Sequence, residues 1–240
     1  ELKGGLGALT AELPALQRLA RFMGTTALVG GAAAFGRSAL NVGREFQAMM
    51  QRVEAATRAG EADMARLSAA AKELGATTAF TAMEAAEAIE VLAKNGVLVA
   101  DILGGALDAS VSLAGALGGE VAPSADLVTD LMQQFRLEAA QLPMIVDRLT
   151  GAAQTSKFGF DDLRLAIAQA GGVAGTFGVE IEDFLTALSA TASSFASGSD
   201  AGTSFKTFLQ RLTPDSAKAA GVMEELGLKF FDAQGNMLEM

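Results

Sequence analysis

Apolar and small residues recur at steps of four and three between Leu28 and Ala56, which is the spacing of a heptad repeat. A pattern kept over about four heptads predicts one long N-terminal helix with a stripe that faces an identical helix of another chain. We call the larger members of this stripe the seam: Leu28, Phe35, Val42, Phe46, Met49 and Val53. The alternative is a long helix packed on its own domain, because alanine is a weak knob and four glycines each cost about 1 kcal/mol in a helix.

Helical periodicity continues after Gly60, with alanine, leucine and glutamate supplying strong helix formers. Thr81 and Glu84 have the spacing of a capping box and mark a sharp helix start. Glycines such as Gly75, and the stretch 171–178, are interpreted as helix ends and connections, and 196–202 as a loop of small residues. The predicted helices cover 61–74, 81–95, 101–117, 123–135, 138–153, a segment that starts at 161, 182–195, 203–212 and 214–226.

The pattern changes after Gly227, where two aromatic residues precede a turn-like Ala-Gln-Gly-Asn. This segment predicts a small β-hairpin over 228–240, with Gly235 available for a turn. The predicted fold is therefore all-α, a multi-helix domain with a long N-terminal helix and a small C-terminal β-hairpin. Its predicted parts are an N-terminal helical segment that could form a coiled coil (1–60), a helical core domain (61–227) and a truncated hairpin (228–240).

Composition removes much enzyme chemistry, because the 240 residues contain no His, Cys, Trp or Tyr. Imidazole bases, thiolate nucleophiles, Cys/His zinc sites and disulfides are excluded, and only carboxylate, lysine or hydroxyl chemistry is left. The adjacent acids Asp161 and Asp162 are better explained by the positive end of a helix that begins there. The glycine-rich stretch 171–178 follows a helix and leads into acids, unlike a phosphate loop. We predict no catalytic residue, no cofactor and no metal.

Charge and chain ends limit the remaining classes. The net charge of −10 and the scattered lysines and arginines argue against specific nucleic-acid binding. The uncharged windows 22–36, 165–179 and 184–199 are shorter than the ~20 apolar residues of a membrane-spanning helix, so none is predicted. Because Glu1 opens the chain and a turn-like sequence nearly closes it, we interpret the chain as a segment of a longer polypeptide.

Several long blocks, in order, resemble the core region of phage tail tape measure proteins, also described as phage-related minor tail proteins. The resemblance covers roughly Gln47 to Asn236, and its blocks are LSAAAKELGATTAFTAMEAAEAIEVLAKNGV, ADLVTDLMQQFRL, TSKFGFDDLRLAIAQAGGVA, SGSDAGTSFKTFLQRL and GLKFFDAQGNM.

The resemblance implies a structural virion protein, not an enzyme. It implies a place in the phage tail lumen after synthesis in the bacterial host cytoplasm, and a role in templating tail tube assembly and tail length before DNA ejection. The implied partners are further copies of itself, as a trimer or hexamer, with tail tube proteins, tail-tip or baseplate proteins and tail assembly chaperones. The long helical ruler of such proteins must lie outside these residues, because even a continuous helix of this length would span only ~360 Å.

Three alternatives remain open. A membrane-active ejection protein would rearrange at the host inner membrane and make transient contact with it. A helical adaptor unrelated to phage would be a monomer with peptide grooves. A carboxylate-based hydrolase would need two acids that converge in a cleft, and the sequence shows no sign of one.

Overall fold

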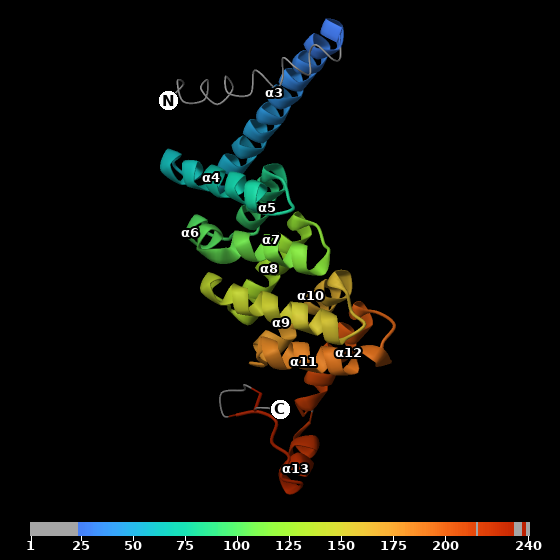
Figure 1. Cartoon of the computed structure of the whole chain (residues 1–240). Helices are drawn as coiled ribbons and strands as arrows, with labels where there is room; N and C mark the ends of the chain where they lie inside the picture. Colours follow the sequence, from blue (N-terminus) through green and yellow to red (C-terminus); the bar gives the residue numbers. More distant parts are fainter. Residues whose placement is uncertain (1–23, 215, 233–236, 239–240) are drawn as a thin grey trace. The chain divides into compact units, whose positions relative to one another are not determined.

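The computed structural model describes residues 24–214, 216–232 and 237–238, with side chains from residue 41 onward. Contacts divide the chain into two units, Glu1–Ala48 and Met49–Met240. Helix α3 (Gly24–Thr57) begins in the first unit and contributes its last residues to the second. The fold described below is that of the second unit (Figure 1).

The unit is built from helices that pack on near neighbours in the chain. Its first part contains α4 (Glu61–Thr77), α5 (Ala82–Lys94) and α8 (Val121–Phe135), and its second contains α9 (Leu142–Thr155), α10 (Phe160–Thr176), α11 (Ile181–Thr191) and α12 (Gly198–Leu212). Helix α5 packs on α4 and α8, α8 on α10, α9 on α11, and α10 on α12. Successive helix pairs therefore share their apolar faces, and the predicted all-α fold is confirmed.

Helix α5 begins where the capping box predicted. The Thr81 backbone N–H donates to Glu84 Oε2 at 2.7 Å, and the Glu84 backbone N–H donates to the Thr81 hydroxyl at 3.2 Å. The Thr81 hydroxyl also donates to Glu84 Oε2 at 2.7 Å. The two hydrogen bonds to the Glu84 carboxylate, the one from the backbone N–H most of all, lower its pKa because they favour the ionised form. The cap orients α5 so that Ala85, Ile89 and Leu92 are buried.

The predicted helix 101–117 is interrupted. It consists of α6 (Val99–Asp101), the π-helical η1 (Ile102–Ala106) and α7 (Leu107–Leu117). Gly105 breaks the regular helix with a φ of 140°, which L-residues avoid. A Cβ atom there would lie 2.9 Å from the Ala139 carbonyl oxygen, so glycine also permits the close approach of the short 3₁₀ helix η2 (Ala139–Gln141).

Several glycines interpreted as helix ends lie inside helices, at points where another element comes close. Gly75 lies within α4, and a Cβ atom there would be 2.8 Å from Cα of Ala82. Gly171 lies within α10, and its Cβ would be 3.2 Å from the Phe135 ring. The glycines therefore allow helices to approach closely, and the predicted connection at 171–178 is wrong for most of its length.

The predicted loop 196–202 is also wrong beyond its first two residues. Helix α12 begins at Gly198, with the Ser197 side chain accepting a hydrogen bond from the Asp200 backbone N–H at 3.2 Å. The Gly198 N–H donates to Asp162 Oδ1 at 2.7 Å, which joins the first turns of α10 and α12. A Cβ at Gly202 would lie 2.6 Å from the Ala166 carbonyl oxygen. Because Gly198 and Gly202 have no side chain, α12 can approach the backbone of α10 closely.

The core consists of aliphatic side chains with a few phenylalanines. Phe184 of α11 packs against Phe135 of α8 with ring centroids 5.6 Å apart, and against Phe205 of α12 at 5.1 Å. The largest fully buried side chains are Phe158, Phe184, Leu67, Ile89, Leu92, Ile102, Leu113, Leu127, Leu131, Leu142, Ile145 and Leu149.

The chain ends in a short helix, α13 (Ala217–Glu225), followed by an irregular segment. The predicted hairpin is not formed by the described residues, which contain only the antiparallel bridge Phe231–Met237 and a hydrogen bond from Leu238 N–H to the Phe230 carbonyl, 2.9 Å. The Met237 N–H donates instead to the Phe177 carbonyl after α10, at 2.6 Å. The segment therefore packs against the helices of its own chain. A single bridged residue pair does not make a strand ladder. Residues 233–236, which include the predicted turn, lie outside the described residues.

Candidate assembly surfaces

Only some of the seam residues are exposed to solvent. Leu28 and Phe35 lie outside the described side chains. Val42 is 61% exposed and Phe46 is partly exposed, whereas Met49 and Val53 are 4% and 0% exposed within the second unit. Two of the six seam residues therefore already contribute to the core of this chain. Self-association through the seam stays a prediction.

An ion-pair cluster explains why the end of α3 belongs to the second unit. Glu90 of α5 is only 8% exposed, and its carboxylate lies 2.7 Å from Lys94 Nζ and 3.7 Å from Arg52 Nε. Arg52 lies on α3, between the buried residues Met49 and Val53. A buried carboxylate needs such partners because desolvation penalises an unpaired charge. The cluster and the apolar contacts together attach the last turns of α3 to α5.

A groove follows helices α9 and α11. It is formed by three adjoining hollows that share lining residues, the largest of about 780 Å³ between α9 and α11 and the others of about 340 and 420 Å³ around the α10–α11 connection. We call this the α9–α11 groove. Its lining includes Gly151, Ala152, Ser189 and Ala190, which leave room for a partner, and the flexible Met144, 47% exposed.

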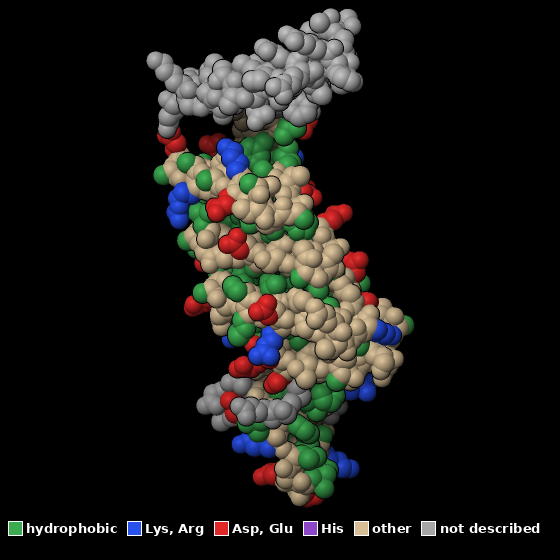
Figure 2. All heavy atoms as spheres, in the orientation of Figure 1, with side chains coloured by type: hydrophobic (Ala, Val, Ile, Leu, Met, Phe, Trp, Pro, Cys, Tyr) green, Lys and Arg blue, Asp and Glu red, His purple; other side chains and the backbone are tan. Residues whose placement is uncertain are grey.

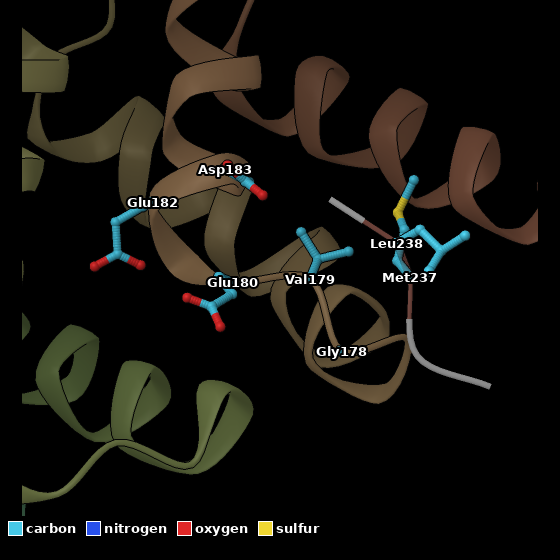
Figure 3. A pocket seen from close by; sticks show the side chains of 7 residues that line it. All are labelled: Gly178, Val179, Glu180, Glu182, Asp183, Met237 and Leu238. Carbon is cyan, nitrogen blue, oxygen red and sulfur yellow. The ribbon is translucent and has the colours of Figure 1, made fainter. Parts of the chain in front are cut away.

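Acidic side chains border this groove. Asp147 comes from α9, Glu180 from the residue before α11, and Glu182 and Asp183 from the first turn of α11. Among the described residues none of these four acids has an ion-pair partner within 4 Å. Figure 3 shows the carboxylates of Glu180 and Glu182 directed to one side of the connection and that of Asp183 to the other. Two arginines, Arg136 and Arg148, also line the groove. Because the four acids outnumber them, the border of the groove carries a net negative charge.

Large apolar side chains are exposed near the end of the described chain. Phe208 is 49% exposed, Val222 46%, Leu226 66% and Leu228 47%. Helix α13 has no buried residue, and a hollow of about 460 Å³ opens between the end of α12, α13 and the segment that follows. Figure 2 shows hydrophobic side chains over α13 on the visible face. Exposed apolar residues in this number are typical of a protein contact.

One carboxylate inside the helical body has a perturbed pKa. Asp130 of α8 is half-buried, and desolvation raises its pKa above the ordinary 3.8, with a further contribution from Asp126 one turn earlier. Asp126 accepts a hydrogen bond from the Asn95 side chain at 2.8 Å. Arg164 of α10 acts in the opposite direction on Asp130. Partial burial, with a like charge one turn earlier as the smaller cause, explains the raised pKa without a catalytic role.

The acids that could have suggested catalysis have structural contacts. Asp161 lies 3.4 Å from Arg164 and Asp162 accepts from Gly198, both within the first turn of α10, where carboxylates complement the helix dipole. Within the described residues, no group of three or more acids is arranged to hold a metal ion.

One described segment, 99–117, has the length and apolar composition of a membrane-spanning helix. It is the interrupted helix α6–η1–α7, and it includes the buried residues Ile102, Leu107 and Leu113. This window contains Asp101 and Asp108, so it lies outside the uncharged stretches on which the prediction of no membrane-spanning helix rests. Core helices of folded domains share these properties, and Gly105 breaks the segment in its middle.

The groove was missed from sequence alone. In the sequence, Glu180, Glu182 and Asp183 argue only against a phosphate loop, and Asp147 lies more than thirty residues earlier. No local motif joins them, because helix packing alone brings α9 beside α11. The one available signal was three acids within four residues at a helix start without a basic neighbour.

Comparison with known proteins identifies the family. Residues 68–240 match the family described as phage-related minor tail protein. The chain is 34% identical over 216 residues to the tape measure protein of Pneumococcus phage Dp-1, an alignment that covers 90% of this chain and 19% of that protein. It is 31% identical over 238 residues to the probable tape measure protein of Escherichia phage P2, covering 96% of this chain and 29% of that protein.

No solved structure matches the chain. The chain spans less than a third of the length of each of the two tape measure proteins, and the alignments cover nearly all of its own residues. The resemblance expected from the sequence blocks is confirmed, and a helical adaptor unrelated to phage is excluded. The chain belongs to the family of phage-related minor tail proteins, structural components of the phage tail.

Proposed function

We propose that this chain is the assembly and docking segment of a tape measure protein, the part that contacts other tail proteins while a helical ruler elsewhere templates tube length. The observation that carries the proposal is the match over nearly the whole chain to two tape measure proteins, together with apolar side chains exposed from Phe208 to Leu228. Tail tube proteins, tail-tip or baseplate proteins and assembly chaperones are the proposed partners of this C-terminal apolar segment.

The test places Leu226→Asp and Leu228→Asp together in the full-length protein of the phage. Both side chains are exposed, so folding should be unchanged, but an apolar contact with a tail partner would have to bury two charges. We expect complete tails to be lost in electron micrographs. The matched control, Gln210→Asp with Thr213→Asp, adds the same charge at exposed polar positions and should leave tails of normal length. Normal tails in the first variant would contradict the proposal.

We propose further that the protein lies in the tail lumen, where its acidity lets DNA pass. Residues 49–240 carry 13 basic and 25 acidic residues, a net charge of −12. Like charge on protein and phosphate backbone prevents adhesion. Replacing exposed acids by lysine should slow DNA ejection from purified phage, and an unchanged ejection rate would count against this role.

Self-association is part of the same proposal. Val42 of the seam is exposed, and Leu28 and Phe35 precede it at heptad spacing. Phe35→Asp with Val42→Asp should reduce the mass measured by light scattering if the seam joins copies into a trimer or hexamer. Gln51→Asp, at an exposed position off the seam, is the control. An unchanged mass in the seam variant would assign association to another surface.

A second candidate function is membrane activity during DNA delivery, favoured by the segment 99–117. Membrane activity would require the segment 99–117 to leave the folded unit, because this segment contributes to the core. Dye release from phospholipid vesicles by the purified chain would support it, and absence of release together with absence of vesicle binding would exclude it for this segment. In either case we propose that the chain catalyses no reaction. Release of fragments from purified peptidoglycan would contradict that.

A further inference from the structure

The two units carry opposite charge. Residues 1–48 contain five lysines and arginines against three acids, a net charge of +2, whereas residues 49–240 have a net charge of −12. The acidity of the second unit includes the border of the α9–α11 groove, where Asp147, Glu180, Glu182 and Asp183 have no ion-pair partner among the described residues. Unpaired acids beside an apolar hollow fit a basic amphipathic partner.

The first unit contains a sequence with this chemistry. Apolar residues recur at helical spacing on both sides of Pro14, and two arginines fall between them: Leu13, Leu16, Arg18, Leu19, Ala20, Arg21 and Met23. At the 100° per residue of a helix, these five apolar positions would share one face, and Arg18 and Arg21 would lie on the opposite side, where Phe22 also falls. These residues lie outside the described part of the chain, and their chemistry is known from the sequence alone.

The groove suits such a segment in shape as well as charge. Its largest hollow, about 780 Å³, is lined by small residues of α9 and α11, among them Gly151, Ala152 and Ala190, with Leu185 and Met144 as apolar contacts. Helix-in-groove recognition uses apolar anchors at spacings of three and four residues, and flanking charges fix the direction. Asp147 and Glu182 line the same hollow, outnumber the arginine that also lines it, Arg148, and would face Arg18 and Arg21.

We propose that the α9–α11 groove of one copy binds residues 13–23 of a second copy of this chain. The contact is heterologous, with a different surface on each partner, so it can repeat from copy to copy and close into a ring or extend as a filament. It is independent of the seam, in which the same residues of each copy would meet, and it does not depend on the proposed docking to tail proteins.

The test measures mass by light scattering over a range of concentrations, using the whole 240-residue chain. The segment variant carries Arg18→Glu with Arg21→Glu, and the groove variant carries Asp147→Lys with Glu182→Lys. Each variant alone places like charges in contact, so we expect association to weaken by about tenfold or more. An equimolar mixture should associate again, because the unchanged groove of the segment variant meets the unchanged segment of the groove variant.

Controls separate charge from position. Glu73→Lys with Glu87→Lys makes the same charge change as the groove variant, at exposed sites on α4 and α5, and should associate like the unchanged chain. Circular dichroism shows whether each variant folds, and recovery in the mixture itself requires folded partners. The proposal is overturned by a chain that is monomeric at all concentrations, by variants that associate normally, or by a mixture that fails to recover.

Discussion

Helices α12 and α13 follow each other in the chain and both contain glycine, alanine and a few large apolar residues, yet they are packed very differently. In α12, Gly198 and Gly202 lie where α10 comes closest, and Leu209 is fully buried. In α13, a Cβ at Gly221 would meet nothing within 4 Å beyond the backbone of its own helix and its chain neighbours, and no residue is buried. The difference shows that a small residue stabilises packing only where a second helix uses the space.

The comparison also separates stability from assembly. The α10–α12 contact belongs to the core of the unit, so damage there should reduce the stability of the whole unit. Helix α13 presents apolar side chains to solvent, so damage there should affect a partner contact and leave global unfolding almost unchanged.

Removal of a core ring should have the largest effect. Phe184 is 0% exposed between Phe135 and Phe205, and Phe184→Ala should lower the free energy of unfolding by about 3–5 kcal/mol through lost burial and a cavity. Phe208 lies 6.2 Å from Phe205 at the solvent end of the same row of rings, and Phe208→Ala should cost less than about 1 kcal/mol. Urea unfolding of both variants measures the contrast, and equal costs would contradict it.

The next effect tests the glycines directly. Gly202→Ala places a Cβ 2.6 Å from the Ala166 carbonyl oxygen and should destabilise the unit by about 1–3 kcal/mol, since backbone must move. Gly221→Ala meets open space, and the higher helix propensity of alanine should stabilise α13 by about 0.5–1 kcal/mol. The first is measured by urea unfolding and the second by hydrogen exchange of α13 amides. Destabilisation by both substitutions would remove the distinction between the helices.

Glycines are also where the sequence-based prediction was weakest. Periodicity and caps located most helices, because a stripe of apolar residues and a Thr81–Glu84 pair are local signals. Gly75 and Gly171 were predicted to end helices, yet each lies inside one. The residue that decides this is distant in the chain, such as Phe135 against Gly171, and a single sequence does not show that neighbour.

The start of α12 could have been predicted. Ser197 and Asp200 have the three-residue spacing of a helix cap, and Gly198 and Gly202 have the four-residue spacing of a close helix contact. The groove could not, because its acids come from α9 and from the start of α11, which only packing brings together. The hairpin prediction rests on the strand propensity of Phe230 and Phe231, which is a local signal. It does not include the contacts that this segment makes with the end of α10, where Phe231 packs on Phe177 and the Met237 N–H donates to the Phe177 carbonyl.

Caps of the same chemistry should differ in effect between the two regions. Thr81→Ala removes the hydroxyl that caps α5, a helix with six buried residues, and should lower the free energy of global unfolding by about 1 kcal/mol. Ser216→Ala removes the equivalent cap of α13, whose side chain accepts from the Ala219 N–H at 3.2 Å. Because α13 buries nothing, we expect only faster amide exchange within it, with an unchanged urea midpoint. A shifted midpoint for Ser216→Ala would show that α13 is coupled to the core.

The smallest effect concerns Asp130, a carboxylate that the packed region partly desolvates. Because burial raises its pKa above 3.8, the folded protein binds this proton more tightly than the unfolded chain does. Its contribution therefore becomes unfavourable as pH rises from about 3.8 through the raised pKa, and is constant above it. Asp130→Asn should gain stability relative to the unchanged chain over that interval.

Glu84 provides the control of opposite sign. Its pKa is lowered from 4.5 by hydrogen bonds from Thr81, so its contribution is favourable above 4.5 and is lost as pH falls through the lowered pKa. The difference in unfolding free energy between Glu84→Gln and the unchanged chain should thus become more unfavourable as pH rises, and that for Asp130→Asn more favourable. Urea unfolding at several pH values measures both slopes. A flat difference for Asp130→Asn would mean that water reaches this carboxylate, and that the packing between α8 and α10 is as open there as the surroundings of α13.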